Sequence, residues 1–234
     1  MDEIEYTGRD NLEVMQEAKN YNKFLLDLVL TQVRNKELTV DFGAGCGTFA
    51  LPIYAANHRL ICVETDPVLA TTLSRKGLTV VKSLNFFEDE SIDYIYSINV
   101  LEHIEHDDLI IKLWIRKLRP GGSLIVYVPA FQELFSSMDM KVGHYRRYKK
   151  RTLELQLKQA GFQVIHTKYA DSLGYLATFI YKVFDKGDGT INLPILKIYD
   201  KWIFPLSRLI DIFCFPFIGK NVYALAKKKL ETPE

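Results

Sequence analysis

The residues best suited to chemistry form a glycine-rich segment with an acidic residue before it and another further along. The segment runs from Asp41 to Gly47 and has glycines at positions 43, 45 and 47. Glycines at alternate positions let the backbone approach a ligand with no Cβ in the way. Glu64 ends the next apolar run, where its carboxylate can accept hydrogen bonds from both hydroxyls of a ribose. This pattern indicates a site for an adenosine-containing ligand.

The spacing of the glycines separates two kinds of adenosine ligand. A dinucleotide fingerprint is G-x-G-x-x-G, and the helix N-terminus that follows it holds a pyrophosphate. Here the glycines follow G-x-G-x-G, and Asp41 precedes them. An anion beside the loop would repel a pyrophosphate, whereas it suits a cationic ligand such as a sulfonium that carries an amino group.

The elements that must position these residues alternate along the chain. Apolar runs predict strands at 38–42, 59–63, 78–81, 92–98, 122–128, 162–169 and 222–226. Helical patterns fall at 11–33, with a break near 20–22, and at 48–57, 67–75, 107–118, 150–160, 173–184 and 196–213. The turn at 120–122 is expected to stop the helix before the fifth strand, and the long connection 129–149 is expected to be functional. Strands that alternate with helices predict a parallel, doubly wound sheet.

In its ordered set of motifs the sequence resembles the class I S-adenosylmethionine-dependent methyltransferases, most strongly over 38–128, and within them the bacterial type 11/12 subgroup. The matching segments are Asp41 to Gly47, Glu64, Asn99 to Ile104 and Leu118 to Gly122. The resemblance implies a Rossmann-like, seven-stranded α/β sheet with its last strand antiparallel. It also implies one domain over 1–234: an N-terminal helical cover at 1–36, a cofactor-binding half at 37–129, and a substrate-side half at 130–234 with a helical insertion at about 172–218, before the last strand.

The resemblance assigns the contacts with S-adenosyl-L-methionine residue by residue. The glycine loop lies under the methionine part of the cofactor, and the acidic residue that ends the second strand binds the ribose. The implied contacts are Tyr21, Asp41, Gly43, Ala44, Gly45, Gly47, Glu64, Thr65, Leu84, Asn99 and Val100. One departure concerns the adenine, for which many relatives carry an acidic residue after the third strand. This chain has Lys82 to Phe86 at that place. A backbone amide at Leu84, together with apolar residues over the adenine, would replace the acidic residue.

A second match, to methyltransferases often found with genes for polysaccharide or natural-product assembly, covers Met138 to Tyr148, with a weaker one at Asn20 to Asn22. His144 is the candidate general base for a hydroxyl acceptor, because its unperturbed pKa suits proton transfer, and the alternative is that it braces the loop. His103 is a second catalytic candidate, more for positioning than for proton transfer. Glu102 and His103 both follow the fourth strand, where the methionine end of the cofactor should lie. Glu102 equally fits the role of a carboxylate at a helix N-terminus.

Four residues of the same segment are candidate acceptor contacts: Asp139, Tyr145, Arg146 and Arg147. Guanidinium groups bind phosphate or carboxylate in a bidentate manner, so an anionic small acceptor fits them. The alternatives are a solvated or internally paired cluster, with Asp139 ordering the arginines, and contact with RNA through the basic run that continues to Arg151. We expect no nucleic-acid partner, because the chain has 30 basic and 29 acidic residues and no separate RNA-binding module.

The C-terminal part of the chain is rich in aromatic residues, namely Tyr175, Phe179, Tyr181, Phe184, Trp202, Phe204, Phe213, Phe215 and Phe217. We expect them to form the core of a helical cap. A greasy acceptor pocket and a contact with a membrane surface are the alternatives. The run from Trp202 to Ile218 is too short and too broken by prolines to span a bilayer, so no transmembrane segment is expected.

Composition sets the remaining limits. With 234 residues, of which 48% are hydrophobic, the chain can bury a full core, which excludes disorder. Three cysteines without paired spacing fit reduced thiols, and no metal site is suggested. The polar, acidic N-terminus differs from a secretory signal. We therefore expect a cytoplasmic protein, with membrane association left open.

Together these features predict an S-adenosylmethionine-dependent methyltransferase acting on a small-molecule, saccharide or lipid-linked acceptor by O-methylation. The alternatives are N-methylation, RNA methylation and a cofactor-binding scaffold that has no turnover. The sequence names neither the acceptor nor the oligomeric state.

Overall fold

The computed structural model describes residues 8–34, 37–184, 187–214 and 217–230. Residues 1–7, on which the expectation about a secretory signal rests, lie outside the described residues, as do Phe215, Pro216 and the side chain of Cys214. Cys46 and Cys62 are free thiols.

One seven-stranded sheet runs through the molecule in the order β3-β2-β1-β4-β5-β7-β6. Its strands are β1 (Thr39–Phe42), β2 (Leu60–Val63), β3 (Val80–Val81), β4 (Ile92–Ile98), β5 (Leu118–Pro129), β6 (Phe162–Ala170) and β7 (Asn221–Lys228). Only β7 runs antiparallel to its neighbours β5 and β6, and the other pairs in the sheet are parallel. This order confirms the Rossmann-like sheet with an antiparallel last strand.

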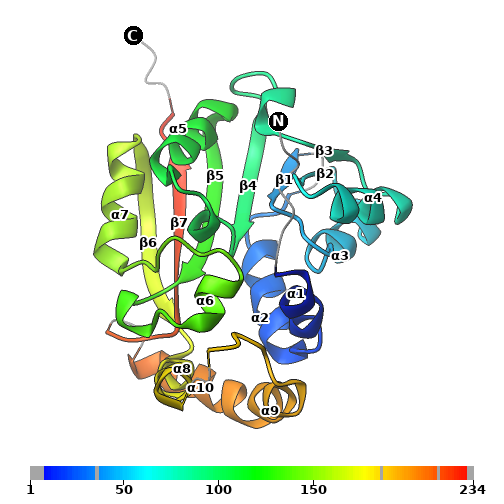
Figure 1. Ribbon diagram of the computed structural model, residues 1–234. Coiled ribbons are helices and arrows are strands. Elements are labelled where there is room, and N and C mark those ends of the chain that lie inside the picture. Colours follow the sequence, from blue (N-terminus) through cyan, green and yellow to red (C-terminus); the bar gives the residue numbers. More distant parts are fainter. Residues whose placement is uncertain (1–7, 35–36, 185–186, 215–216, 231–234) are drawn as a thin grey trace.

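The helices and helical turns lie around the sheet and at one end of it (Figure 1). The α-helices are α1 (Arg9–Met15), α2 (Lys19–Leu30), α3 (Ala50–Ala55), α4 (Pro67–Arg75), α5 (Asp107–Lys117), α6 (Ser137–Lys141), α7 (Lys150–Gln159), α8 (Ser172–Phe184), α9 (Leu193–Ile198) and α10 (Phe204–Cys214). The 3₁₀ turns are η1 (Leu84–Phe86), η2 (Leu101–His103) and η3 (Gln132–Leu134), and a π-helix, η4 (Tyr199–Ile203), joins α9 to α10.

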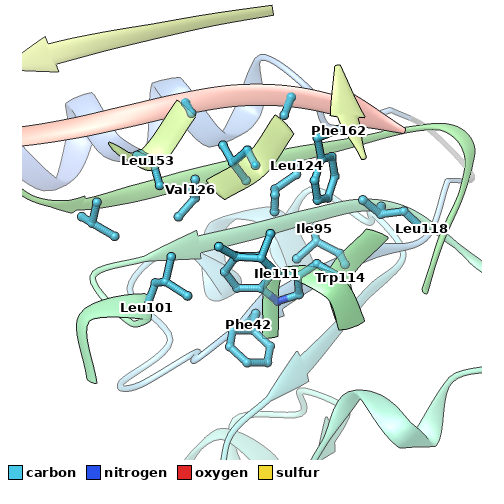
Figure 2. Packing of buried hydrophobic residues seen from close by; sticks show 14 of the residues in the cluster. Phe42, Ile95, Leu101, Ile111, Trp114, Leu118, Leu124, Val126, Leu153 and Phe162 are labelled. Carbon is cyan, nitrogen blue, oxygen red and sulfur yellow. The ribbon is translucent and has the colours of Figure 1, made fainter. Parts of the chain in front are cut away.

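Side chains alternate between the two faces of the sheet and build a core on each. On one face Val40, Ile95 and Val126 pack under α5 and α7, where Trp114 is fully buried and meets Phe42 edge to face at 5.3 Å (Figure 2). On the other face Tyr94, Tyr96, Ile125 and Tyr127 pack with residues of α2, α3 and α10. Since period-two alternation on a sheet covered on both sides leaves apolar residues at every position, the central strands appear in the sequence as continuous apolar runs.

The N-terminal helical region breaks earlier than the expected position near 20–22, because a distant residue fixes the start of α2. Asp200 of η4 accepts hydrogen bonds from the backbone N–H groups of Asn20 and Tyr21, both at 2.9 Å. A carboxylate at this position satisfies donors that a helix N-terminus leaves without partners. The break therefore falls between Met15 and Lys19.

One expectation about the connections is wrong. The turn at 120–122 does not stop α5, which already ends at Lys117; it lies inside β5 as an irregularity, and the pairing with β4 shifts between Ile92 and Tyr94. The connection 129–149, which was expected to be functional, contains η3 and α6. A capping box between Ser136 and Asp139 starts α6, a local signal that was present in the sequence.

A cap of α8, α9, η4 and α10 lies at the end of the sheet to which the arrows of β4 and β5 point (Figure 1). Asp211 of α10 holds the start of α8 by accepting hydrogen bonds from the backbone N–H groups of Asp171 and Ser172, at 2.8 and 2.9 Å. Within the described residues, no helix is both long and apolar enough to cross a membrane.

The expectation that the aromatic residues form the core of this cap is wrong for most of them. Phe204 is buried and packs on Tyr21, with their ring centroids 5.4 Å apart. The exposed ones are Phe179, Phe184, Trp202, Phe213 and Phe217. The physical reason lies on the inner side of α8, where the small residues Gly174 and Thr178 are the buried ones and the large apolar residues are left outside.

Candidate functional site

The glycine loop follows β1 and adopts a backbone that only glycine takes without strain. Gly43, Gly45 and Gly47 have φ of 83°, 54° and 81°. A Cβ at Gly43 would lie 2.4 Å from a methyl carbon of Val100, which follows β4. The loop and the segment after β4 are therefore packed against each other, as the sequence predicts for two parts of one cofactor site.

Glu64, at the end of β2, binds the loop from the other side. Its Oε2 accepts a hydrogen bond from the backbone N–H of Gly45 at 2.7 Å, and its Oε1 accepts one from Asp66 at 2.9 Å. The N-terminal cover lies nearby, because Arg9 of α1 forms an ion pair with Asp66 at 2.7 Å. Each carboxylate oxygen of Glu64 keeps a second lone pair, so it can still accept a hydrogen bond from a ribose hydroxyl.

Asp41 is buried in β1 beside the loop. Burial is the main reason why its pKa rises to about 7; the charge of Glu64 adds to the rise and the nearby Tyr96 hydroxyl opposes it. Its Oδ2 atom has no hydrogen-bond partner among the described residues. The carboxyl groups of Asp41 and Glu64, beside a loop whose glycines carry no Cβ, fit a ligand that has a cationic amino acid part and a ribose. They would repel a pyrophosphate.

The remaining expected cofactor contacts fall around this loop. Ala44 is buried, Thr65 is exposed, and the side chain of Leu84 is buried in the core, so a contact between Leu84 and the cofactor would have to come from its backbone. Asn99 has a φ of 53° and donates its backbone N–H to the carbonyl of Tyr127 at 2.8 Å. Tyr21 is buried, and its hydroxyl lies close to Asn99 and Tyr127. Burial raises the pKa of this hydroxyl to about 12.

The segments after β4 and after α6, which are expected to face the acceptor, bring together Glu102, His103 and His144. Glu102 and His103 lie in η2, directly after the Val100 that contacts the glycine loop, and His144 follows α6. The rings of His103 and His144 meet edge to face with centroids 4.5 Å apart, and His144 Nε2 lies 3.7 Å from Glu102 Oε1. Burial raises the pKa of Glu102 to about 7, and burial together with the charge of His144 lowers that of His103 to about 4.

His144 is held in place by a buried carboxylate. Its Nδ1 atom lies 2.7 Å from Asp139 Oδ1. Arg147 donates to both oxygens of Asp139, with Nε and Nη2 each 2.9 Å from their acceptors. Although burial alone would raise it, hydrogen bonds from His144 and Arg147 hold the pKa of Asp139 well below its usual range. Asp139 therefore orders His144 and Arg147. The sequence analysis had given this role as the alternative to a contact between Asp139 and the acceptor.

The other expected acceptor residues are engaged within the chain. Arg146 pairs with Asp107 at 2.9 Å and donates to the carbonyl of Glu105 at 2.6 Å. Tyr145 is exposed, and its backbone N–H donates to the carbonyl of Glu102 at 2.8 Å. Since Arg147 is also occupied by Asp139, these contacts favour the internally paired alternative for both arginines.

Sequence reasoning gave Glu102 no place among the site residues, yet it is the most deeply buried acid of the cluster. Its side chain is fully buried, and neither carboxylate oxygen has a hydrogen-bond partner among the described residues. The one signal in the sequence was its position directly before His103. Nothing in a linear pattern brings it next to a histidine more than 40 positions away.

Comparisons with known proteins agree with this geometry. Residues 15–167 match a family described as a methyltransferase domain. A protein of Mycolicibacterium vanbaalenii named an uncharacterized methyltransferase is 27% identical over 177 residues, covering 73% of this chain and 69% of that protein.

Solved structures share the fold at lower identity. A chain from the complex between the Haloferax volcanii Trm112 methyltransferase activator and a methyltransferase has a TM-score of 0.65 at 15% identity, covering 97% of this chain and 96% of that chain. A SAM-dependent methyltransferase of Thermotoga maritima has a TM-score of 0.62 at 18% identity, covering 94% of each chain.

Proposed function

Because this chain belongs to the methyltransferase domain family and is an S-adenosyl-L-methionine-dependent enzyme, we propose that it methylates an oxygen of a small or lipid-linked acceptor. The choice of oxygen rests on the position of the His144 ring. Buried Asp139 orients this ring, and Glu102, which lies beside it, follows directly after the segment that contacts the glycine loop.

The cofactor end of the site binds and orients. When bound, S-adenosyl-L-methionine supplies a methyl group on a positively charged sulfur. A lone pair of the acceptor forms the new bond to the methyl carbon, and the sulfur keeps the electron pair of the C–S bond that breaks. Glu64 accepts the ribose hydroxyls, and the glycine loop lies against the methionine part. The bound ammonium group favours the charged form of Asp41, whose carboxylate then attracts it. Most of the rate of such an in-line displacement can come from holding the two reactants in line and excluding water.

The acceptor end must remove a proton. An amine that is already neutral needs no base, whereas a hydroxyl gains about 10²- to 10⁴-fold in rate from one. A carboxylate that fixes one ring nitrogen of a histidine leaves the other free to act on a substrate. The Asp139–His144 pair has this arrangement at 2.7 Å, so the geometry favours a hydroxyl acceptor over an amine.

The cap supports an acceptor that is lipid-linked or held at a membrane surface. Among the residues that the structure describes, more than half of the exposed large apolar side chains fall within 176–217, including Ile180, Trp202, Leu209 and Phe213. An exposed apolar surface of this extent on helices marks an interaction site rather than an ordinary surface. Amphipathic helices that place such residues in the headgroup region bind a membrane without crossing it.

A basic groove beside the cap adds charge complementarity. A pocket of about 630 Å³ is lined by Lys149, Lys150, Arg151, Glu154, Leu155, Lys158, Tyr169 and Phe217, and Glu154 pairs with Lys158 at 2.6 Å. Within the described part of the chain, Lys150 and Arg151 have no carboxylate partner. Cations next to exposed apolar residues suit the phosphate of an anionic lipid or of a lipid-linked saccharide.

Radiolabelled methyl transfer tests the proposal. The purified chain is offered polyprenyl-phosphate-linked saccharides in vesicles, free sugars, amines and RNA, and the product is located by tandem mass spectrometry. We expect methylation of a hydroxyl, reduced at least about 100-fold in H144A and unchanged in H166A, with S-adenosyl-L-methionine affinity equal in all three proteins. Transfer to nitrogen or RNA alone, or full activity of H144A on its hydroxyl acceptor, would contradict the proposal.

A further inference from the structure

We propose that Glu102, His103 and His144 form a binding site for one divalent transition-metal ion of the Zn²⁺ class, which holds the acceptor oxygen. The binding of the ion stands on its own geometry, whereas its role toward the acceptor rests on the proposed function. The sequence analysis expected no metal site. The three residues come from two segments more than 40 positions apart, so only the fold brings them together.

The three side chains lie close enough together to become ligands of one ion. Each offers one ligand atom, and these atoms all lie within 4.8 Å of one another. The 3.7 Å between His144 Nε2 and Glu102 Oε1 is too long for a hydrogen bond. Two atoms that each lie about 2.1 Å from a tetrahedral zinc ion are about 3.4 Å apart, so small side-chain adjustments close the site.

Glu102 lacks the partner that a buried carboxylate needs. Its side chain is fully buried, and neither of its oxygens accepts a hydrogen bond from any residue that the structure describes. Leaving a carboxylate buried and unsatisfied is costly, which is why such groups are paired or coordinate a metal. A cation between Glu102 and the two imidazoles would satisfy it.

Both histidines are fixed as metal ligands are. Metal-bound histidines nearly always donate their second ring N–H to a carboxylate or a backbone carbonyl, which orients the ring. His144 has Asp139 at 2.7 Å on Nδ1, which leaves Nε2 directed at Glu102. The ring of His103 makes hydrogen bonds with the backbone at Val142 and Gly143. Arg147 in turn holds Asp139, so the surrounding contacts are complete before any ion binds.

The set of ligands selects the kind of ion and its task. Two imidazole nitrogens and one carboxylate oxygen suit Zn²⁺ and its first-row neighbours, whereas Mg²⁺ and Ca²⁺ prefer oxygen ligands throughout. Three protein ligands leave at least one coordination position open. An acceptor hydroxyl bound there loses its proton to solvent water more readily, and the resulting oxygen attacks the methyl carbon. With the ion bound, His144 Nε2 is a ligand, so the ion replaces His144 as the group that helps the hydroxyl lose its proton. In the metal-free chain the Asp139–His144 pair keeps the role of base that the proposed function gives it.

Cobalt and zinc titrations test the site. The chelator-stripped chain is titrated with Co²⁺ while its visible absorption is recorded, and Zn²⁺ is then added in competition. We expect one Co²⁺ per chain and its displacement by Zn²⁺. Binding should weaken at least about 100-fold in E102Q, H103A and H144A, about 10-fold or more in D139N, and not at all in H166A, which changes a histidine outside the cluster.

A matched measurement separates this inference from the proposed function and from misfolding. Calorimetric binding of S-adenosyl-L-methionine shows which variants keep a folded cofactor site. Absence of Co²⁺ binding, or equal binding by the wild type and by H144A and E102Q that retain the cofactor, would overturn the metal site and leave the methyltransferase proposal standing. Stoichiometric Co²⁺ binding that depends on the three ligands, in a chain that never methylates a hydroxyl, would support the site and overturn the proposed function.

Discussion

The two ends of the site differ in which groups form them, backbone around the glycine loop and side chains around His144. At the cofactor end, the backbone makes the site: three glycines with positive φ form the loop, and two backbone N–H groups hold Glu64. At the end proposed for the acceptor, side chains make it, since Arg147 holds Asp139, Asp139 holds His144, and His144 lies beside Glu102. A backbone site tolerates no added Cβ, whereas a side-chain cluster can lose one member and keep its fold. Substitutions at the two ends should therefore fail in different ways.

The largest effect is expected at Gly43. The change G43A adds a Cβ 2.4 Å from a methyl carbon of Val100 in a residue whose φ is 83°. We expect the free energy of unfolding to fall by about 3–5 kcal/mol and cofactor binding to be lost. The control G187A has a φ of 87° with nothing within 4 Å of the added Cβ, so it should cost only about 1 kcal/mol. Equal losses in chemical denaturation would show that Gly43 is not packed against Val100.

Asp41 should show a dependence of stability on pH. Because the native state keeps the Asp41 proton up to about pH 7 while the usual pKa is 3.8, the free energy of unfolding falls as pH rises between these values. The change D41N removes this loss, so the variant should gain stability over the wild type on going from pH 4 to pH 8, by on the order of 3 kcal/mol. Denaturation of both proteins at the two pH values measures it. A difference that does not change with pH would contradict the shifted pKa.

Glu64 should matter for binding more than for stability. The change E64A removes a charged acceptor for the ribose hydroxyls, worth about 1.5–3 kcal/mol, or roughly 10- to 150-fold in cofactor affinity. Calorimetric titration measures the loss, with E37A, a surface acid paired with Arg119, as the control. Unchanged affinity in E64A would remove Glu64 from the site.

The smallest effect concerns the cap. The change L209S removes an apolar side chain that is 62% exposed on α10, and we expect its binding to phosphatidylglycerol vesicles to weaken by about 1 kcal/mol, or roughly fivefold. The control L109S changes a side chain that is 58% exposed on α5, a helix that packs on one face of the sheet and lies apart from the cap in Figure 1, and should bind like the wild type. Equal sedimentation of all three proteins with vesicles would contradict a membrane-facing cap.

The contrast between the two ends also explains what the sequence could predict. The glycine loop, Glu64 and the start of α4 at Asp66 and Pro67 depend on neighbours a few positions away, so their spacing alone indicates them. The cluster around His144 depends on Glu102 and on the fold that brings them together, so His144 could be proposed as a base without its partner. The cap was misjudged because apolar residues in a helix do not reveal whether a neighbour covers them, and Phe213 and Trp202 turned out to be exposed.

The most direct test of the separation between the two ends is one calorimetric series with S-adenosyl-L-methionine. The wild type and H144A should bind it with equal affinity, E64A should bind it at least about 10-fold more weakly, and none of the three should bind NAD. Loss of binding in H144A as severe as that in E64A, or binding of NAD by the wild type, would contradict the account.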